Sequence, residues 1–204
     1  MIVFARARRP IGLLLLSAIG SIISIPPALA HHPMEGSTEP FGVWAGLLSG
    51  MAHPLLGPDH LLFLLAIGLV GLSRPMVWVP LLLAAGLGGS ALGLLLPGLP
   101  ASEVLVAVSL VLIALVLQKG WDARLLLPAI AVHGYVLSGT VLGWEATPLA
   151  AYLVGLLLCQ GVLLTVAVQL VRRWAERASS EALALVRGGL IGIGAAFSWS
   201  ALVA

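Results

Sequence analysis

Long apolar runs separated by short polar joints dominate this chain. Most of them approach the length of about 20 residues that a helix needs to cross a bilayer. The pattern predicts an all-α, polytopic transmembrane helical bundle that forms one domain and has six spans. They are expected near 52–72 with a broken start, 76–97, 103–118, 125–142, 148–171 and 185–203.

The composition agrees with this class. The chain is 60% hydrophobic and 9% charged, which leaves too little polar surface to cover a soluble globule of this size. The formal charge of +2 is small and the arginines are scattered, so a nucleic-acid partner is not expected. The expected partner is the lipid bilayer that surrounds the helices. Cys159, the one cysteine, lies inside an apolar run and is expected to fill the core.

The first 30 residues have the pattern of a secretory signal peptide. A basic start is followed by an apolar stretch at 11–25, and Ala28-Leu29-Ala30 has the small-x-small form of a cleavage site. The basic start consists of Arg6, Arg8 and Arg9. Cleavage would leave 31–204 as the transmembrane domain; the alternative is an uncleaved first helix.

The basic residues of the mature chain indicate its orientation. If the mature N-terminus lies outside, six spans place every lysine and arginine on the inner side, as the positive-inside rule requires. These residues are Arg74, Lys119, Arg124, Arg172, Arg173, Arg177 and Arg187. We therefore expect a multi-pass protein of the bacterial cytoplasmic membrane.

The run at 41–72 is too long for one straight span. At about 1.5 Å per residue it would far exceed a hydrocarbon core of about 30 Å. Pro54 disfavours helical geometry at the residue before it, whereas Pro58 is well placed to begin a helix. We predict a short outer segment at 41–52, an unwound link at 53–57 and a helix from Pro58 to about Leu72.

Ionisable side chains are costly inside a membrane and usually functional. We expect His53, Asp59 and His60 toward the outer end of the first span, His133 near the midplane, and Glu103 at the outer start of the third. Imidazole and carboxylate groups suit a borderline divalent cation such as nickel, cobalt, zinc or copper. Alternatives remain for single residues: Asp59 or Glu103 as a helix cap, and His133 as a hydrogen-bonded core residue.

One motif resembles a known family. The segment His53-Pro54-Leu55-Leu56-Gly57-Pro58-Asp59-His60 resembles the HPxxGxDH signature of the HupE/UreJ family, membrane proteins associated with hydrogenases or ureases. Glu103 with Ser109, His133-Gly134-Tyr135 and the segment at 143–149 resemble further family patterns. The chain departs from the family at Leu137-Ser138-Gly139, where members often carry a second histidine or a Gly-Glu pair.

The resemblance implies a permease that carries nickel, or alternatively cobalt, into the cytoplasm for hydrogenase or urease maturation. It implies a principal metal site of His53, Asp59 and His60, with His133 and Glu103 as secondary candidates. The metal is cargo, and no resident cofactor is expected. No GxxxxGK[ST] phosphate-binding loop occurs, so the gradient, the membrane potential or an intracellular sink would drive uptake.

Two other classes stay open. An intramembrane zinc hydrolase could use the three histidines as ligands, Asp59 as a base and Ser109 as a helper. A metal-binding accessory subunit would not transport at all. Small residues at 84–91 and 188–196 predict close helix packing, either within the chain or against a second copy.

Overall fold

The structure, a computed structural model, describes residues 42–143 and 145–203. Every regular element within these ranges is a helix, which confirms the all-α class. The elements are α3 (Val43–Leu56), α4 (Pro58–Ala66), η1 (Ile67–Val70), α5 (Pro75–Leu95), α6 (Ser102–Lys119), η2 (Ala123–Leu125), α7 (Leu126–Gly139), α8 (Ala146–Val166), η3 (Ala167–Val171), α9 (Arg172–Ala175) and α10 (Ser180–Val203). The expected signal peptide lies outside the described residues.

The membrane-spanning elements follow from helix length and composition. Among the described residues, four helical stretches are long and apolar enough to cross a bilayer, at 75–95, 102–119, 146–175 and 180–203. The pair α3 and α4–η1 qualifies as a fifth when taken together, bent by 73° at its break. The sixth expected span, 125–142, corresponds to the shorter apolar helix Ala123–Gly139.

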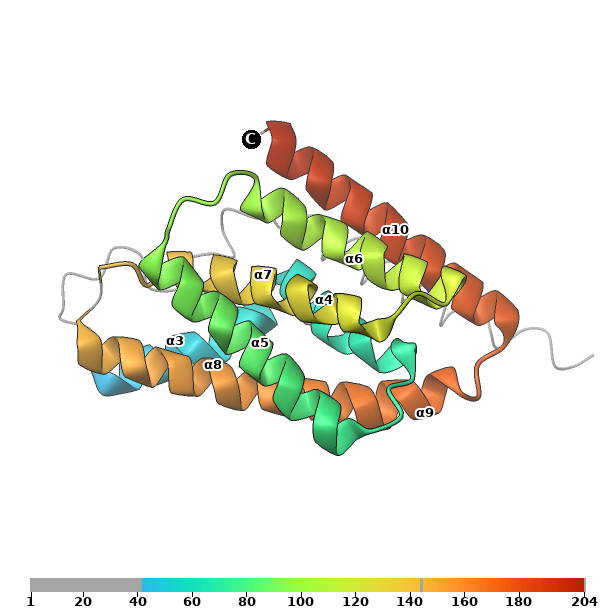
Figure 1. The fold of residues 1–204 in the computed structure, drawn as a ribbon, viewed down its shortest axis with the longest axis horizontal. Coiled ribbons are helices and arrows are strands. Elements are labelled where there is room, and N and C mark those ends of the chain that lie inside the picture. The colour runs from blue at the N-terminus through green and yellow to red at the C-terminus, as the bar shows by residue number, and fades with distance from the viewer. Residues whose placement is uncertain (1–41, 144, 204) are drawn as a thin grey trace, which may run out of the picture.

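Three helix pairs form the bundle: α3 beside α8, α5 beside α7, and α6 beside α10 (Figure 1). Glycine allows the closest approach between α3 and α8, where a Cβ on Gly50 would meet the Tyr152 carbonyl oxygen. Gly89 has the same role on α5, against Ala131 of α7. The small-residue packing predicted at 84–91 thus occurs within the chain. On α10, a Cβ built on Gly188 meets no atom of the other described elements within 4 Å.

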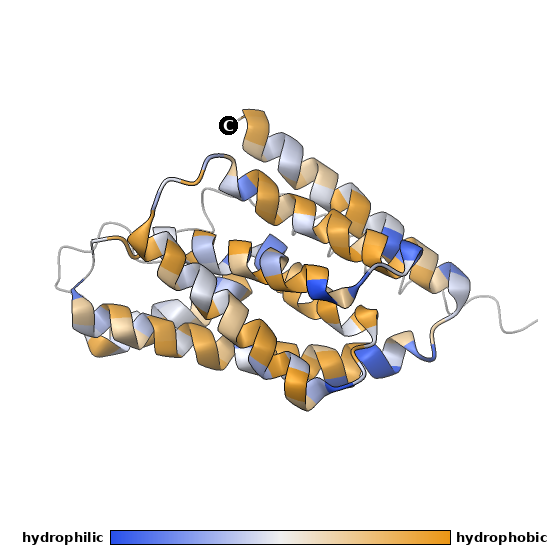
Figure 2. Cartoon of the chain, viewed as in Figure 1, coloured by the Kyte–Doolittle hydropathy of each residue, from blue (hydrophilic) through white to orange (hydrophobic). Residues whose placement is uncertain are grey.

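The described lysines and arginines lie in segments at one end of the bundle, which we call the basic end. Figure 2 shows strongly hydrophilic positions in the joints at this end. These lysines and arginines lie in the joints before α5, between α6 and α7, and after α8, and in the first turns of α10. The opposite end, here the acidic end, carries Glu103 at the start of α6 and Glu145 before α8. This separation is the one that the positive-inside rule expects of a membrane protein.

The break in the first span differs from the prediction. Helix α3 continues through His53 and Pro54 to Leu56, so the predicted unwound link at 53–57 is wrong. Only Gly57 is non-helical, and its N–H closes the last turn of α3 on the His53 carbonyl oxygen at 3.1 Å. A proline removes one helical hydrogen bond, and close packing against a neighbouring helix compensates for such a loss in membranes. The restart at Pro58 is as predicted.

The break lies deep in the bundle. Helix α3 runs alongside α8: Gly46 lies near Pro148, and Gly50 lies near Tyr152 and Leu156. The chain continues along α8 through α4 and η1, where Gly68 lies against Ala167. At about 1.5 Å per residue, His53 lies about 15 Å from the start of α3. The histidines of the motif therefore reach the level of His133, deeper than the outer position expected from the sequence.

Candidate metal-ion site

The first turn of α4 holds a bonded carboxylate and imidazole. Asp59 Oδ1 accepts the backbone N–H of His60 at 2.8 Å and lies 3.0 Å from His60 Nδ1. An ionised carboxylate can only accept, so the ring proton of His60 belongs on Nδ1 and the lone pair on Nε2. His60 Nε2 is buried and has no hydrogen-bond partner. Asp59 thus accepts a backbone N–H of the first helical turn and orients the ring, but it is not a cap, because the N-cap residue of α4 is Gly57 and no side chain caps this helix.

His133 on α7 is oriented in the same way by a serine. The Ser109 hydroxyl lies 2.6 Å from the Val106 carbonyl oxygen and 2.8 Å from His133 Nε2. The hydroxyl has one proton, which it donates to the carbonyl, so it accepts the N–H of His133 Nε2. The lone pair is then on Nδ1, which is buried and unpartnered. Phe63 stacks on the ring with centroids 4.1 Å apart and fixes its plane.

His53, at the end of α3, has a tyrosine in the corresponding role. The Tyr152 hydroxyl donates to the Leu137 carbonyl oxygen at 2.7 Å and lies 3.3 Å from His53 Nδ1. By the same reasoning it accepts the N–H of His53 Nδ1, which makes Nε2 the lone-pair nitrogen. Each histidine thus has an oxygen partner that fixes its tautomer, an arrangement typical of the surroundings of metal-binding histidines.

The three rings converge from three different helices. The His60 centroid lies 4.8 Å from that of His133 and 6.3 Å from that of His53. The three residues are at most 5% exposed, whereas the Asp59 side chain is 20% exposed. We call His53, His60 and His133 the histidine cluster. Among the described residues, however, no group of three or more His, Cys, Asp or Glu side chains is arranged tightly enough to hold a metal ion.

Glu103 lies at the acidic end of the bundle. It is exposed in the first turn of α6, and its side chain makes no capping hydrogen bond to the start of that helix. It lines a cavity of about 170 Å³ at the acidic end. Tyr135 closes one side of this cavity, because its hydroxyl donates to the Leu96 carbonyl oxygen at 2.7 Å and accepts the Leu99 N–H at 2.8 Å. Glu103 therefore contributes a negative charge to this cavity.

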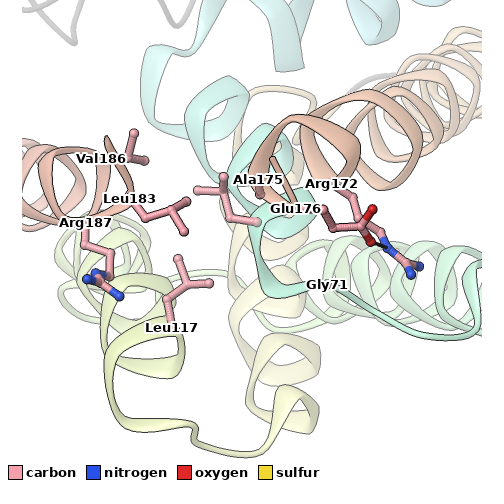
Figure 3. Close-up of a pocket in the computed structure, with 9 residues that line it drawn as sticks. Gly71, Leu117, Arg172, Ala175, Glu176, Leu183, Val186 and Arg187 are labelled. Atoms are coloured by element: carbon pink, nitrogen blue, oxygen red, sulfur yellow. Dashed lines mark hydrogen bonds and ion pairs between the residues drawn. The ribbon is translucent and has the colours of Figure 1, made fainter. Parts of the chain in front are cut away.

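A second cavity, of about 200 Å³, lies at the basic end between η1, α6, α9 and α10 (Figure 3). Arg172 lines it, bonded to Glu176 at 2.8 Å and to the Leu72 carbonyl oxygen at 2.7 Å. Arg187 also lines it. Two guanidinium groups and one paired carboxylate make this cavity unsuited to a cation.

Most of the residues of this site were predicted from the sequence, but one was not. Sequence reasoning identified the motif residues and His133, but it did not single out Tyr152. A tyrosine is the one aromatic side chain in the largely aliphatic run at 149–171, which is the signal that could have found it. Glu103 was predicted at the outer start of the third span, and it lies in the first turn of α6, where it lines the cavity at the acidic end; its role as a ligand stays a prediction.

A comparison with known protein families found one match. The family model described as "HupE / UreJ protein" matches residues 19–197. Neither the curated proteins nor the solved structures gave a match.

Proposed function

The chain belongs to the HupE/UreJ family, and on this premise we propose that it is a membrane permease for a divalent transition-metal ion. The ion is nickel, with cobalt as the alternative, and it moves from the outer side to the cytoplasm to supply metalloenzyme maturation. The observation that carries this proposal is the histidine cluster, in which each ring has an oxygen atom within hydrogen-bond distance of one of its nitrogens.

The chemistry of the cluster suits such an ion. Neutral imidazole nitrogens are ligands for nickel, cobalt, copper and zinc, whereas magnesium and calcium prefer oxygen. Two lone-pair nitrogens, His60 Nε2 and His133 Nδ1, are buried without a partner. A buried polar atom without a hydrogen bond costs stability, and a passing cation would satisfy both. An open ligand set also fits a carrier, because tight coordination would slow release.

The distribution of charge supports a direction. Glu103 at the acidic end would concentrate cations near the entrance. The basic end corresponds to the cytoplasmic side by the positive-inside rule. An inside-negative potential then favours entry of a divalent ion by about 4.6 kcal/mol per 100 mV, twice the value for a single charge.

The hydrolase alternative has less support. Ser109 would be a helper in that mechanism, but its hydroxyl is already engaged by the Val106 carbonyl oxygen and by His133 Nε2. Asp59 is bonded to His60 and orients that ring. These bonds suit residues that hold ligands in place.

The test is uptake of radioactive nickel by cells that lack nickel transporters of their own. We expect uptake with the intact protein and its loss in His53→Ala and in Asp59→Ala at matched membrane levels. Gln169→Leu is the control, because Gln169 is exposed and lies outside the motif and the histidine cluster. If the intact protein takes up neither nickel nor cobalt, zinc or copper, transport is refuted.

A further inference from the structure

Gln160 on α8 is a buried polar side chain that the histidine cluster does not use. It is 1% exposed, and its side-chain oxygen Oε1 has no hydrogen-bond partner. The described residues contain only two other buried side-chain atoms of this kind, and both belong to His60 and His133. A buried amide oxygen without a partner destabilises the fold, so its presence calls for a function.

Gln160 lies on the core-facing stripe of α8. Tyr152, Leu156, Gln160 and Leu164 are spaced four residues apart and are at most 1% exposed. The first of them contacts His53 through its hydroxyl. Gln160 follows eight residues later, about 12 Å further along the helix toward the basic end. The amide therefore lies on the same stripe as the tyrosine partner of the cluster, but deeper.

Contacts with α5 and α7 place the oxygen more closely. A Cβ built on Gly86 would lie 3.4 Å from Gln160 Oε1 and 3.9 Å from the Ile130 carbonyl oxygen. Ile130 precedes His133 by three residues on α7, which is one turn toward the basic end. Gln160 Oε1 is thus near the turn of α7 that follows the histidine cluster in the inward direction.

The surroundings of Gln160 toward the basic end are apolar. The buried residues of that core are hydrophobic and include Ile67, Leu82, Ile113, Leu126 and Leu164. The three buried serines of the described residues donate to backbone carbonyl oxygens: Ser90 to Gly134, Ser109 to Val106 and Ser138 to Tyr135. Among the described residues, Gln160 Oε1 is the one buried side-chain oxygen without a hydrogen-bond partner.

We propose that the side-chain oxygen of Gln160 is a transit ligand for the divalent cation, which it contacts after the ion leaves the histidine cluster toward the basic end. The inference rests on the proposed transport function and adds a residue to its pathway. An amide oxygen is a neutral, hard ligand that holds nickel or cobalt less firmly than imidazole does. It would lower the barrier to leaving the cluster without trapping the ion.

Gln160→Leu tests the proposal, since it removes the oxygen and keeps nearly the same volume. We expect the initial rate of nickel uptake to fall about tenfold or more, as the loss of one interaction with a charged group predicts. Nickel binding by the purified protein, measured by calorimetry, should stay within about twofold of the original, because the cluster is intact. The melting temperature should not fall, because the lost atom makes no hydrogen bond.

Gln160→Glu and Gln169→Leu complete the experiment. The first keeps an oxygen at this position and should restore uptake to within a few-fold of the original rate. The second removes an exposed glutamine further along the same helical stretch and should leave uptake unchanged. Nickel uptake by the original protein with an equal rate in Gln160→Leu would overturn the inference but not the proposed function. If Gln160→Leu loses uptake and also binds nickel more weakly or melts at a lower temperature, Gln160 has a structural role. This result would also overturn the inference.

Discussion

Replacing Ser109 by alanine tests whether oxygen partners set the tautomers of the histidine cluster. The substitution removes the acceptor of the His133 Nε2–H at a site that is 3% exposed. If the proton stays on Nε2, a buried donor loses its partner, which costs about 1–3 kcal/mol of stability. If the proton moves to Nδ1, no buried donor loses its partner. The lone pair of His133 is then on Nε2, on the side from which the serine hydroxyl was removed, and Nδ1 has no lone pair for a metal ion.

Both outcomes weaken metal binding. Loss of an oxygen partner of a metal-binding histidine lowers affinity about 10- to 100-fold, which corresponds to about 1.4–2.7 kcal/mol. We therefore expect the nickel dissociation constant of Ser109→Ala, measured by calorimetry on purified protein, to rise by about that factor. Nuclear magnetic resonance of labelled histidine would show which nitrogen of His133 carries the proton in each protein.

Ser90→Ala is the matched control. Ser90 is also fully buried, but its hydroxyl donates to the Gly86 and Gly134 carbonyl oxygens and contacts no histidine. We expect some loss of stability and an unchanged nickel affinity. An affinity of Ser109→Ala within twofold of the original, with the proton of His133 still on Nε2, would refute the argument that Ser109 orients a ligand.

Two further substitutions have clear expected outcomes. Tyr152→Phe removes the hydroxyl that contacts His53 and should lower nickel affinity about tenfold. Tyr135→Phe removes a hydroxyl that bonds the loop at the acidic end and should leave nickel affinity unchanged. Calorimetry on both purified proteins measures the two affinities. Gly50→Ala places a Cβ against the Tyr152 carbonyl oxygen and should cost about 1–3 kcal/mol, measured by thermal unfolding. Gly88→Ala, where a Cβ meets nothing within 4 Å, should be neutral or stabilising by up to about 1 kcal/mol; equal effects of the two would contradict the close packing of α3 on α8.

Several features of the fold and site were predictable because they depend on neighbouring residues. Pro58 begins α4 as expected, since proline at the first helical position loses no hydrogen bond. Asp59 then falls in the first turn, and its contact with His60 follows from adjacency. The path of α3 through Pro54 was not predictable, because it depends on packing against α8, which begins about 90 residues later.

By itself, the sequence determined the membrane class, the all-α architecture and the family motif with its candidate ligands. The physical reason is that a bilayer imposes length and apolarity on each span separately, so these properties can be read segment by segment. The tertiary structure alone decided which side chains meet. Ser109 reaches His133 across 24 positions and Tyr152 reaches His53 across 99, and these contacts depend on how helices distant in the sequence pack together.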